Sequence, residues 1–249
     1  MAEAVVHLRE VEPAIMRITL EDRVHKNTFS EGICAGLVSA FEVVKRNSTC
    51  KVVIVTGYDT YFCCGGTKEG LLDLWAGKSK FTDYPLYRLP LACDVPVIAA
   101  MQGHGIGGGL ILGMFADFVV FSRESIYTAN FMKYGFTPGF GSTLVLREKL
   151  GLPLAQEMLL TAASYRGAEL YERGIAFPVV SRADVPAHAL QLARQLADKP
   201  RRSLVTLKSH MTADLRSRLP AVAELEVLMH EQTLHQPEVV ERIRTLFEQ

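Results

Sequence analysis

The feature that most constrains the fold is an apolar run that breaks into glycines, VPVIAAMQGHGIGGGLILGMFAD at residues 95–117. Its first part has the β-branched pattern of a buried strand, and its last part fits a helix. The glycines between Gly103 and Gly113 carry no Cβ atom, so they permit positive φ and leave peptide N–H groups uncovered at a helix start. The run therefore predicts a strand, a tight turn and a site for a negatively charged oxygen.

Three interpretations of this turn remain open. Gly103, Gly105 and Gly108 match the spacing of a dinucleotide-binding turn, but that match is weak. A long segment precedes it, and Glu124, the nearest suitably spaced acid, lies in a turn-like sequence. The glycines could also serve only the close packing of helix on strand. The third interpretation is an oxyanion hole for a thioester carbonyl, which needs a second N–H donor.

A second strand-like segment, KVVIVTGY at residues 51–58, offers that donor. It runs through DTYF into CCGGT at residues 63–67, just ahead of a helical pattern. A strand that leads through small residues to a helix start thus occurs twice. Two N–H groups aimed at one oxygen would stabilise an enolate in a water-poor site.

These segments resemble the crotonase (enoyl-CoA hydratase/isomerase) superfamily. The similarity is carried by KVVIVTGYDTYFCCGGT and by the sequence from VPVIAAMQGHGIGGG to FTPGFGSTLVLREKLG, and it covers nearly the whole chain. It implies an α/β fold, a crotonase-like spiral of ββα units with a helical C-terminal region, usually assembled as a trimer or a dimer of trimers. It also implies that the backbone N–H groups of Gly66 and Gly108 hold the thioester oxygen.

Two departures from the family pattern bear on the chemistry. Members that hydrate a double bond use two glutamates, and the corresponding positions here are Ile111 and Phe131. Neither side chain can transfer a proton, which disfavours hydration. Decarboxylation fits such a pocket, because loss of CO2 itself generates the carbanion equivalent whose charge the oxyanion hole receives. A cation for the carboxylate and an acid for reprotonation then suffice.

A narrower resemblance supplies candidates for these two roles. FTDYPLY at 81–87 and YTANFMKYGFTPG at 127–139 are similar to the crotonase-like decarboxylases of polyketide β-branching, which act on 3-methylglutaconyl groups on an acyl carrier protein. This resemblance implies Lys80 and His230 as the polar pair, and a pKa near neutrality would suit His230 to proton donation. Taken alone, Lys80 is typical of a surface charge, and His230 of a surface histidine paired with Glu226 one turn earlier.

Further residues near these motifs are expected to line the substrate site. They are Cys64, His104, Ile111, Phe131, Tyr84 and Tyr87. His104 has an alternative role, because it could hydrogen-bond backbone and hold the glycine loop. The two tyrosines could instead pack in a lid or in the core. A nucleophilic role for Cys64 or its neighbour Cys63 is disfavoured, since no histidine is placed to activate either thiol.

Composition and charge limit the size of the core, the kind of partner and the location that we expect for the chain. At 249 residues and 49% hydrophobic content, the chain can bury one large core. Its 27 basic and 27 acidic residues balance, which gives no indication of a nucleic-acid partner. The charged N-terminal sequence predicts neither a signal peptide nor a membrane span, so we expect a cytoplasmic protein. Five cysteines without a C-x-x-C pair indicate reduced thiols and no metal site.

We therefore expect a spiral core over residues 1–199 and a helical C-terminal subdomain over 200–249 that covers the active site and serves assembly. The helical pattern is interrupted at Lys199–Pro200 and again at Leu219–Pro220. The predicted function is decarboxylation of a 3-methylglutaconyl thioester on an acyl carrier protein to the 3-methylcrotonyl thioester. No cofactor is expected beyond the phosphopantetheine of the carrier protein or of CoA. The alternatives are an isomerase or hydratase with displaced acid–base groups, and a non-catalytic acyl-thioester binding protein.

Overall fold

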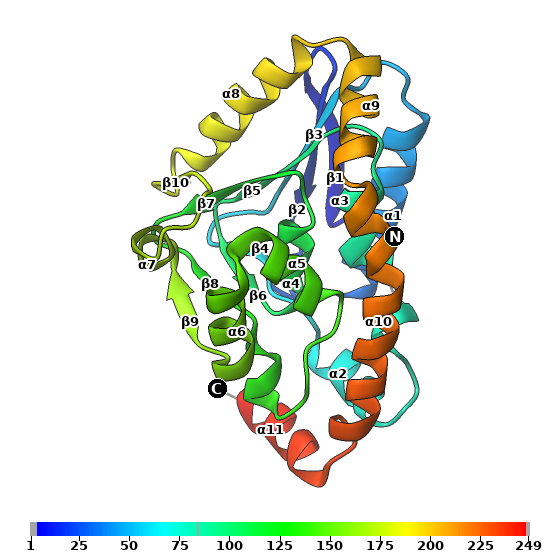
Figure 1. Ribbon diagram of the computed structural model, residues 1–249, viewed down its shortest axis with the longest axis vertical. Coiled ribbons are helices and arrows are strands. Elements are labelled where there is room, and N and C mark those ends of the chain that lie inside the picture. Colours follow the sequence, from blue (N-terminus) through cyan, green and yellow to red (C-terminus); the bar gives the residue numbers. More distant parts are fainter. Residues whose placement is uncertain (1–3, 84, 248–249) are drawn as a thin grey trace.

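The strands of this computed structural model, which describes residues 4–83 and 85–247, form two sheets (Figure 1). The larger sheet consists, in spatial order, of β1 (Val6–Glu12), β2 (Ile15–Leu20), β3 (Val52–Thr56), β5 (Val97–Met101), β7 (Phe118–Ser122) and β10 (Val179–Val180). The smaller sheet consists of β4 (Tyr61–Cys63), β6 (His104–Ile106), β8 (Ile126–Thr128) and β9 (Ser164–Arg166). Pairing is parallel except for β1 with β2 and β8 with β9.

Each glycine-rich segment contributes two strands, where the sequence pattern indicated one. The chain passes from β3 in the larger sheet to β4 in the smaller sheet and then into α2 (Lys68–Trp75). It repeats this path through β5, β6 and α4 (Gly108–Met114). Both strand pairs, β3 with β5 and β4 with β6, are parallel, so the two ββα units stack in the same direction. Their helix starts consequently lie at the same edge of the smaller sheet.

Hydrophobic residues on both faces of the larger sheet explain its nearly continuous apolar strands. Successive side chains of a strand point to opposite faces, so Val53 and Val55 of β3 enter the main core. Val52 and Ile54 pack on the other face in a smaller core with α8 (Val185–Ala197). Figure 1 shows α8 lying along this outer face of the sheet. The strand pattern thus reflects a sheet covered on both sides.

The other helices pack on the two sheets and on one another, with the first of them lying against β1 and β2. Those that precede residue 200 are α1 (Glu31–Arg46), α3 (Leu89–Ala92), α5 (Ser142–Leu150), α6 (Leu152–Thr161) and α7 (Gly167–Glu172), with the 3-10 helices η1 (Phe81–Asp83), η2 (Pro85–Arg88) and η3 (Asn130–Tyr134). The C-terminal helices are α9 (Arg201–Met211), α10 (Ala213–Thr233) and α11 (Pro237–Phe247). Within the described ranges, none of the helices combines the length and apolarity that crossing a membrane would need.

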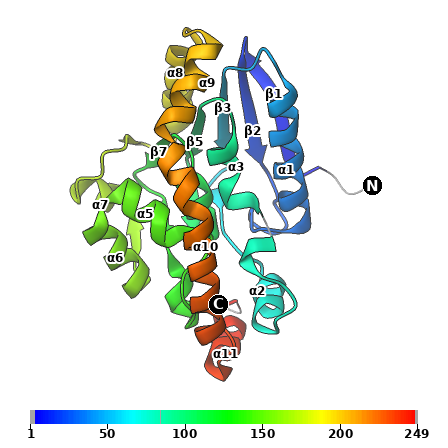
Figure 2. The ribbon, with the colours of Figure 1, turned by 45° about the vertical axis from the view of Figure 1, so that its right-hand side comes forward.

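The C-terminal helices run along the molecule and end beside α2. Figure 2 shows α9 and α10 following one another down its long axis, with α11 at the end where α2 lies. The buried Lys208 anchors α9, because its Nζ donates to the carbonyls of Pro90 and Val95 at 3.0 Å each and pairs with Asp117 at 2.6 Å. A helical C-terminal region is therefore present, while the division of the chain at residue 200 stays a prediction.

One expected helix break is wrong. The interruption at Lys199–Pro200 separates α8 from α9, but Pro220 lies inside α10. A proline in a helix interior removes one hydrogen bond and costs about 3 kcal/mol. Leu219 and Ala223 are both buried, and this packing on either side of the proline holds the helix together. The buried contacts of α10 thus outweigh the helix-breaking effect of Pro220.

Candidate active site

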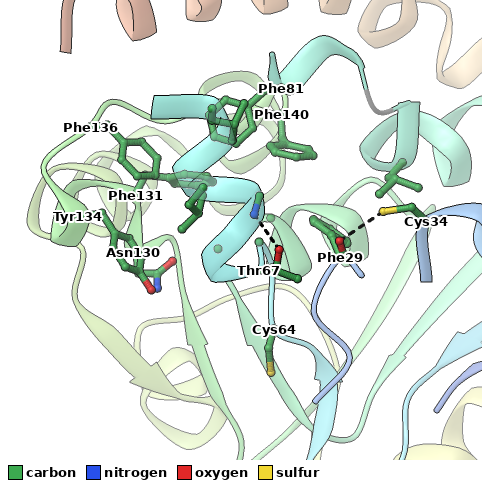
Figure 3. A pocket seen from close by; sticks show the side chains of 18 residues that line it. Phe29, Cys34, Cys64, Thr67, Phe81, Asn130, Phe131, Tyr134, Phe136 and Phe140 are labelled. Carbon is green, nitrogen blue, oxygen red and sulfur yellow. Dashed lines mark hydrogen bonds between the residues drawn. The ribbon is translucent and has the colours of Figure 1, made fainter. Parts of the chain in front are cut away.

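An apolar cavity of about 750 Å³, measured with its open mouth, lies where the two glycine-rich units meet (Figure 3). Six aromatic side chains form much of its wall, namely Phe29, Phe81, Phe131, Tyr134, Phe136 and Phe140. Among the described residues that line it, none carries a carboxylate, an imidazole or an amino group. Among its described residues, the wall therefore has no acidic or basic side chain that could activate water. Any chemistry in this cavity depends on the few polar groups that line it.

Two backbone N–H groups are the main polar candidates at this wall. Gly66 and Gly108 both line the cavity, and both lie at helix starts. Gly66 precedes Thr67, whose hydroxyl caps α2, and Gly108 is the first residue of α4. In the described part of the chain neither N–H has a hydrogen-bond acceptor, as is usual in the first turn of a helix. Neither donor is thus engaged by an acceptor within the described part of the chain.

Close contact between the two glycine loops explains why both donors open on one cavity. Gly65 has φ 75°, and a Cβ added there would lie 2.7 Å from the carbonyl oxygen of Ile106 and 3.3 Å from the nitrogen of Gly108. Gly107 has φ 53°, which also favours glycine. Side chains at these positions would push the loops apart and separate the two N–H groups.

Lys80 and His230 share a second cavity, of about 620 Å³, although they are far apart in the sequence. The Lys80 side chain is 61% exposed, and its Nζ lies 4.0 Å from a carboxylate oxygen of Glu231. His235 faces the same carboxylate at 3.5 Å. Lys80 therefore points toward solvent from the rim of this cavity, where it can meet an incoming anion.

His230 differs from its interpretation as a surface histidine paired with Glu226, since it is not at the surface and the Glu226 carboxylate bonds other groups. Its side chain is buried, with the residue only 5% exposed, and its Nε2 has no hydrogen-bond partner. The Phe81 ring centroid lies 4.4 Å from the imidazole centroid. Burial lowers the pKa of His230 to about 4, so the expectation of a pKa near neutrality is wrong. The imidazole is neutral at pH 7 until an anion approaches it.

Phe81 separates the two cavities. It lines both of them, and its ring lies 4.8 Å from the Phe140 ring on one side while contacting His230 on the other. Figure 3 shows Phe81 and Phe140 side by side at the wall of the first cavity. Phe81, with Leu74, therefore lies between His230 and a ligand that occupies the first cavity.

A Phe81→Ala substitution should raise the pKa of His230 from about 4 toward its usual value of 6.5, because water would replace the ring beside the imidazole. Titration of the imidazole carbon resonance by NMR measures this pKa directly. Phe136→Ala is the matched control, since that ring lies 6.1 Å from the imidazole. Equal titration curves in the Phe81 variant and the wild type would show that Phe81 does not isolate His230.

The low pKa of His230 also predicts a pH dependence of folding stability. The unfolded histidine takes up a proton near pH 6.5 and the folded one only near pH 4, so the unfolded state binds more protons between these values. Stability should therefore fall as pH decreases, by about 2 kcal/mol between pH 7 and pH 5. Urea unfolding at both pH values measures the loss, which His230→Gln should reduce. A loss of equal size in that variant would assign the effect to other groups.

Among the other expected site residues, Cys64 and Phe131 line the first cavity. Burial raises the pKa of the Cys64 thiol to about 12 and that of Cys63 as well, so neither is a thiolate at neutral pH. Ile111 is completely buried one turn into α4 and is not part of the cavity lining. The two positions that correspond to the family glutamates thus present a phenyl ring and a core side chain.

His104 and the tyrosines take other positions. His104 lies on β6 outside the cavity lining, and its Nδ1 accepts a hydrogen bond from the Ile126 N–H at 2.9 Å. This contact corresponds to the alternative role of holding the loop. Tyr87 is buried and packs against Phe140 with ring centroids 5.4 Å apart, also outside the lining. Tyr84 lies outside the described residues.

Asn130 is a cavity residue that the sequence did not single out. It begins η3, lines the cavity, and its Oδ1 would lie 2.7 Å from a Cβ added at Gly107. Within the described ranges its side-chain amide has no hydrogen-bond partner, so it is free to contact a ligand. In the sequence, only its position directly before Phe131 indicated that Asn130 could lie in the site. Asparagine in such a segment is commonly a turn residue.

Metal ligands do not cluster in the described ranges, where no three or more His, Cys, Asp or Glu side chains are grouped to hold an ion. Besides backbone N–H groups, the two cavities are lined by one amide (Asn130), the hydroxyls of Thr67, Ser79 and Tyr134, and the ionisable side chains of Lys80, His230, Glu231 and His235. The absence of a cofactor remains a prediction.

The chain belongs to the enoyl-CoA hydratase/isomerase family, whose model matches residues 10–249. It is 57% identical over 247 residues to the bacillaene synthase decarboxylase PksI of Bacillus subtilis (strain 168), with 99% of each protein covered. A solved structure from a dehydratase/decarboxylase enzyme couple involved in polyketide β-branching matches with a TM-score of 0.97 at 57% identity, covering 97% of this chain and 96% of that one.

A second group of solved structures supports the same assignment. The ECH2 decarboxylase domain of CurF from Lyngbya majuscula matches with a TM-score of 0.95 at 50% identity, covering 98% of this chain and all of that domain. These matches confirm the crotonase-like fold. They also confirm the narrower resemblance, because proteins described as decarboxylases are similar to this chain over almost its full length.

Proposed function

We propose that this protein is a decarboxylase of polyketide β-branching, which converts a 3-methylglutaconyl thioester to a 3-methylcrotonyl thioester. The observation that carries the proposal is a cavity with two unpaired backbone N–H groups and, among its described lining residues, no carboxylate. Such a wall stabilises an enolate but offers no group to activate water. Relatives that are 57% and 50% identical and described as decarboxylases support this choice over hydration.

In the proposed reaction, the thioester oxygen accepts hydrogen bonds from the N–H groups of Gly66 and Gly108. The carboxylate end extends past Phe81 toward Lys80, whose charge orients it. The bond between the carboxylate carbon and its neighbour breaks, CO2 leaves, and the electron pair moves into the thioester enolate. Charge development on the oxygen is the step that the two donors stabilise.

His230 is proposed to return a proton to the carbon that carried the carboxylate. Burial keeps the imidazole neutral in the free protein, but a substrate carboxylate beside it would raise its pKa, because an opposite charge favours the protonated form. The proton is then taken up as substrate binds and transferred after CO2 is lost. Substrate binding thus prepares the acid that completes the reaction.

We further propose an acyl carrier protein as the partner that delivers the substrate, and a trimer or dimer of trimers as the assembly. The carrier is supported by the enzyme couple of polyketide β-branching to which this chain is similar. The assembly is supported by exposed apolar pairs on α9 (Leu207 and Met211) and α10 (Leu225 and Leu228). Light scattering measures the assembly state. A cytoplasmic location stays a prediction.

Parallel incubations with two substrates test the proposed reaction. We expect 3-methylglutaconyl thioester to lose CO2 and crotonyl thioester to stay unchanged, because neither Ile111 nor Phe131 can activate water. Formation of 3-hydroxybutyryl thioester would identify a hydratase, and a shifted double bond an isomerase. Tight binding of the 3-methylglutaconyl thioester without any product would indicate a non-catalytic binding protein.

A further inference from the structure

Glu226 is a buried carboxylate that the proposed reaction does not use. It lies on α10 and is only 2% exposed. One oxygen accepts from the Gly141 N–H at 2.7 Å, and the other accepts from the N–H and the hydroxyl of Thr143 at 2.9 and 2.6 Å. Because such a group loses its hydration on folding, three charge-assisted bonds are needed to hold it there.

These bonds cap one helix with a side chain of another. Gly141 is the N-cap residue of α5, has φ 70° and contributes no capping side chain. The Glu226 carboxylate supplies the missing acceptor, and its negative charge lies at the positive end of the α5 dipole. The Glu226 carboxylate therefore fastens the turn before α5 to α10, and the preceding Thr137 also bonds Thr233 of α10.

The fastened turn lines the first cavity and lies against His230, which lines the second. Phe140 lines the first cavity, and Gly139 lies against the imidazole, since an added Cβ would be 2.5 Å from Cε1 of His230. His230 follows Glu226 by one helical turn on the same face of α10. Glu226 and His230 thus contact neighbouring parts of one turn, and a small gap bounded by Gly139, Phe140, Glu226 and His230 lies between them.

We propose that Glu226 is a positioning residue, which fixes His230 against the wall of the thioester cavity by fastening the turn at residues 139–143 to α10. The inference rests on the proposed role of His230 in proton transfer. Glu226 does not line the thioester cavity, so its effect passes through the turn and the helix. A displacement of about 1 Å at a catalytic group can cost about 10²-fold in rate, which makes this attachment consequential.

Glu226→Gln tests the proposal with little change in size. The amide can accept at one oxygen only, so an NH2 group would face the N–H of Gly141 or of Thr143. We expect kcat to fall by about 10- to 10²-fold while KM changes little, because Gly66 and Gly108 still bind the thioester. We also expect the pKa of His230, followed by NMR, to rise as water enters the loosened turn. The exposed Glu224 on α10 provides the control, Glu224→Gln.

The NMR measurement needs no turnover, so it tests the attachment even if the protein proves to catalyse another reaction. The charged and titratable groups near His230 are Lys80, Tyr87, Glu226, Glu231 and His235, and all of them except Glu226 are unchanged in every variant. A folded Glu226→Gln protein with the kcat and the His230 titration of Glu224→Gln would overturn the proposal. If Glu226→Gln does not fold, Thr143→Val removes one bond only, and an unchanged kcat and His230 titration in that variant would overturn it equally.

Discussion

Replacing Gly108 with proline should lower turnover by about 10²–10³-fold, because the substitution removes one of the two N–H donors that stabilise the enolate oxygen. Gly108 is the first residue of α4, a position where proline is well tolerated. The fold should therefore persist. Turnover of the 3-methylglutaconyl thioester measures the loss, and circular dichroism checks the helix content.

Gly108→Ala is the matched control for this experiment. A Cβ at this position would lie 2.7 Å from a ring carbon of Phe29, so both variants must displace that ring by a similar amount. Only the proline variant lacks the N–H group, and the alanine variant accounts for the displacement of the Phe29 ring. Equal turnover in both would contradict an oxyanion hole at Gly108.

Removing either member of the polar pair should have an effect of similar or greater size. His230→Ala eliminates the proposed proton donor and Lys80→Ala the cation for the carboxylate, and each should lower kcat by roughly 10²–10⁴-fold. The Lys80 side chain is mostly exposed, so its loss should leave stability nearly unchanged. Single-turnover kinetics separate this effect from substrate binding.

Two control variants accompany these substitutions. Lys78→Ala removes an exposed lysine from the same segment, one that pairs with Asp73 at 3.1 Å. His210→Ala removes an exposed histidine from α9. Both should retain wild-type turnover. If His230→Ala or Lys80→Ala were as active as these controls, that residue would have no role in catalysis.

The glycine-rich turns could be predicted from sequence because their signal is local. A buried strand pattern, a cluster of residues without Cβ atoms and a helical pattern together require backbone N–H groups near a helix start. Gly66 and Gly108 line the same cavity for this reason. The strands β4 and β6 were not separated from β3 and β5, because short apolar segments carry no clear boundary signal.

The surroundings of His230 could not be predicted in this way. Its common cavity with Lys80 followed only from the family resemblance, since no local pattern connects η1 to α10. The alternative pairing of His230 with Glu226 joins residues one helical turn apart and is reasonable in an isolated helix. The start of α5 instead provides three stronger donors for that carboxylate, and the Phe81 ring removes water from the imidazole. Long-range packing thus decides both the pKa of His230 and the hydrogen-bond partners of Glu226.

Intact-protein mass spectrometry of a 3-methylglutaconyl-loaded acyl carrier protein tests the central claim most directly. The loaded carrier is measured before and after incubation with the wild-type protein, and in parallel with Gly108→Pro. We predict that the wild type lowers the carrier mass by that of one CO2, and that the variant does so far more slowly. An unchanged mass, or a gain of one water, would contradict decarboxylation in this cavity.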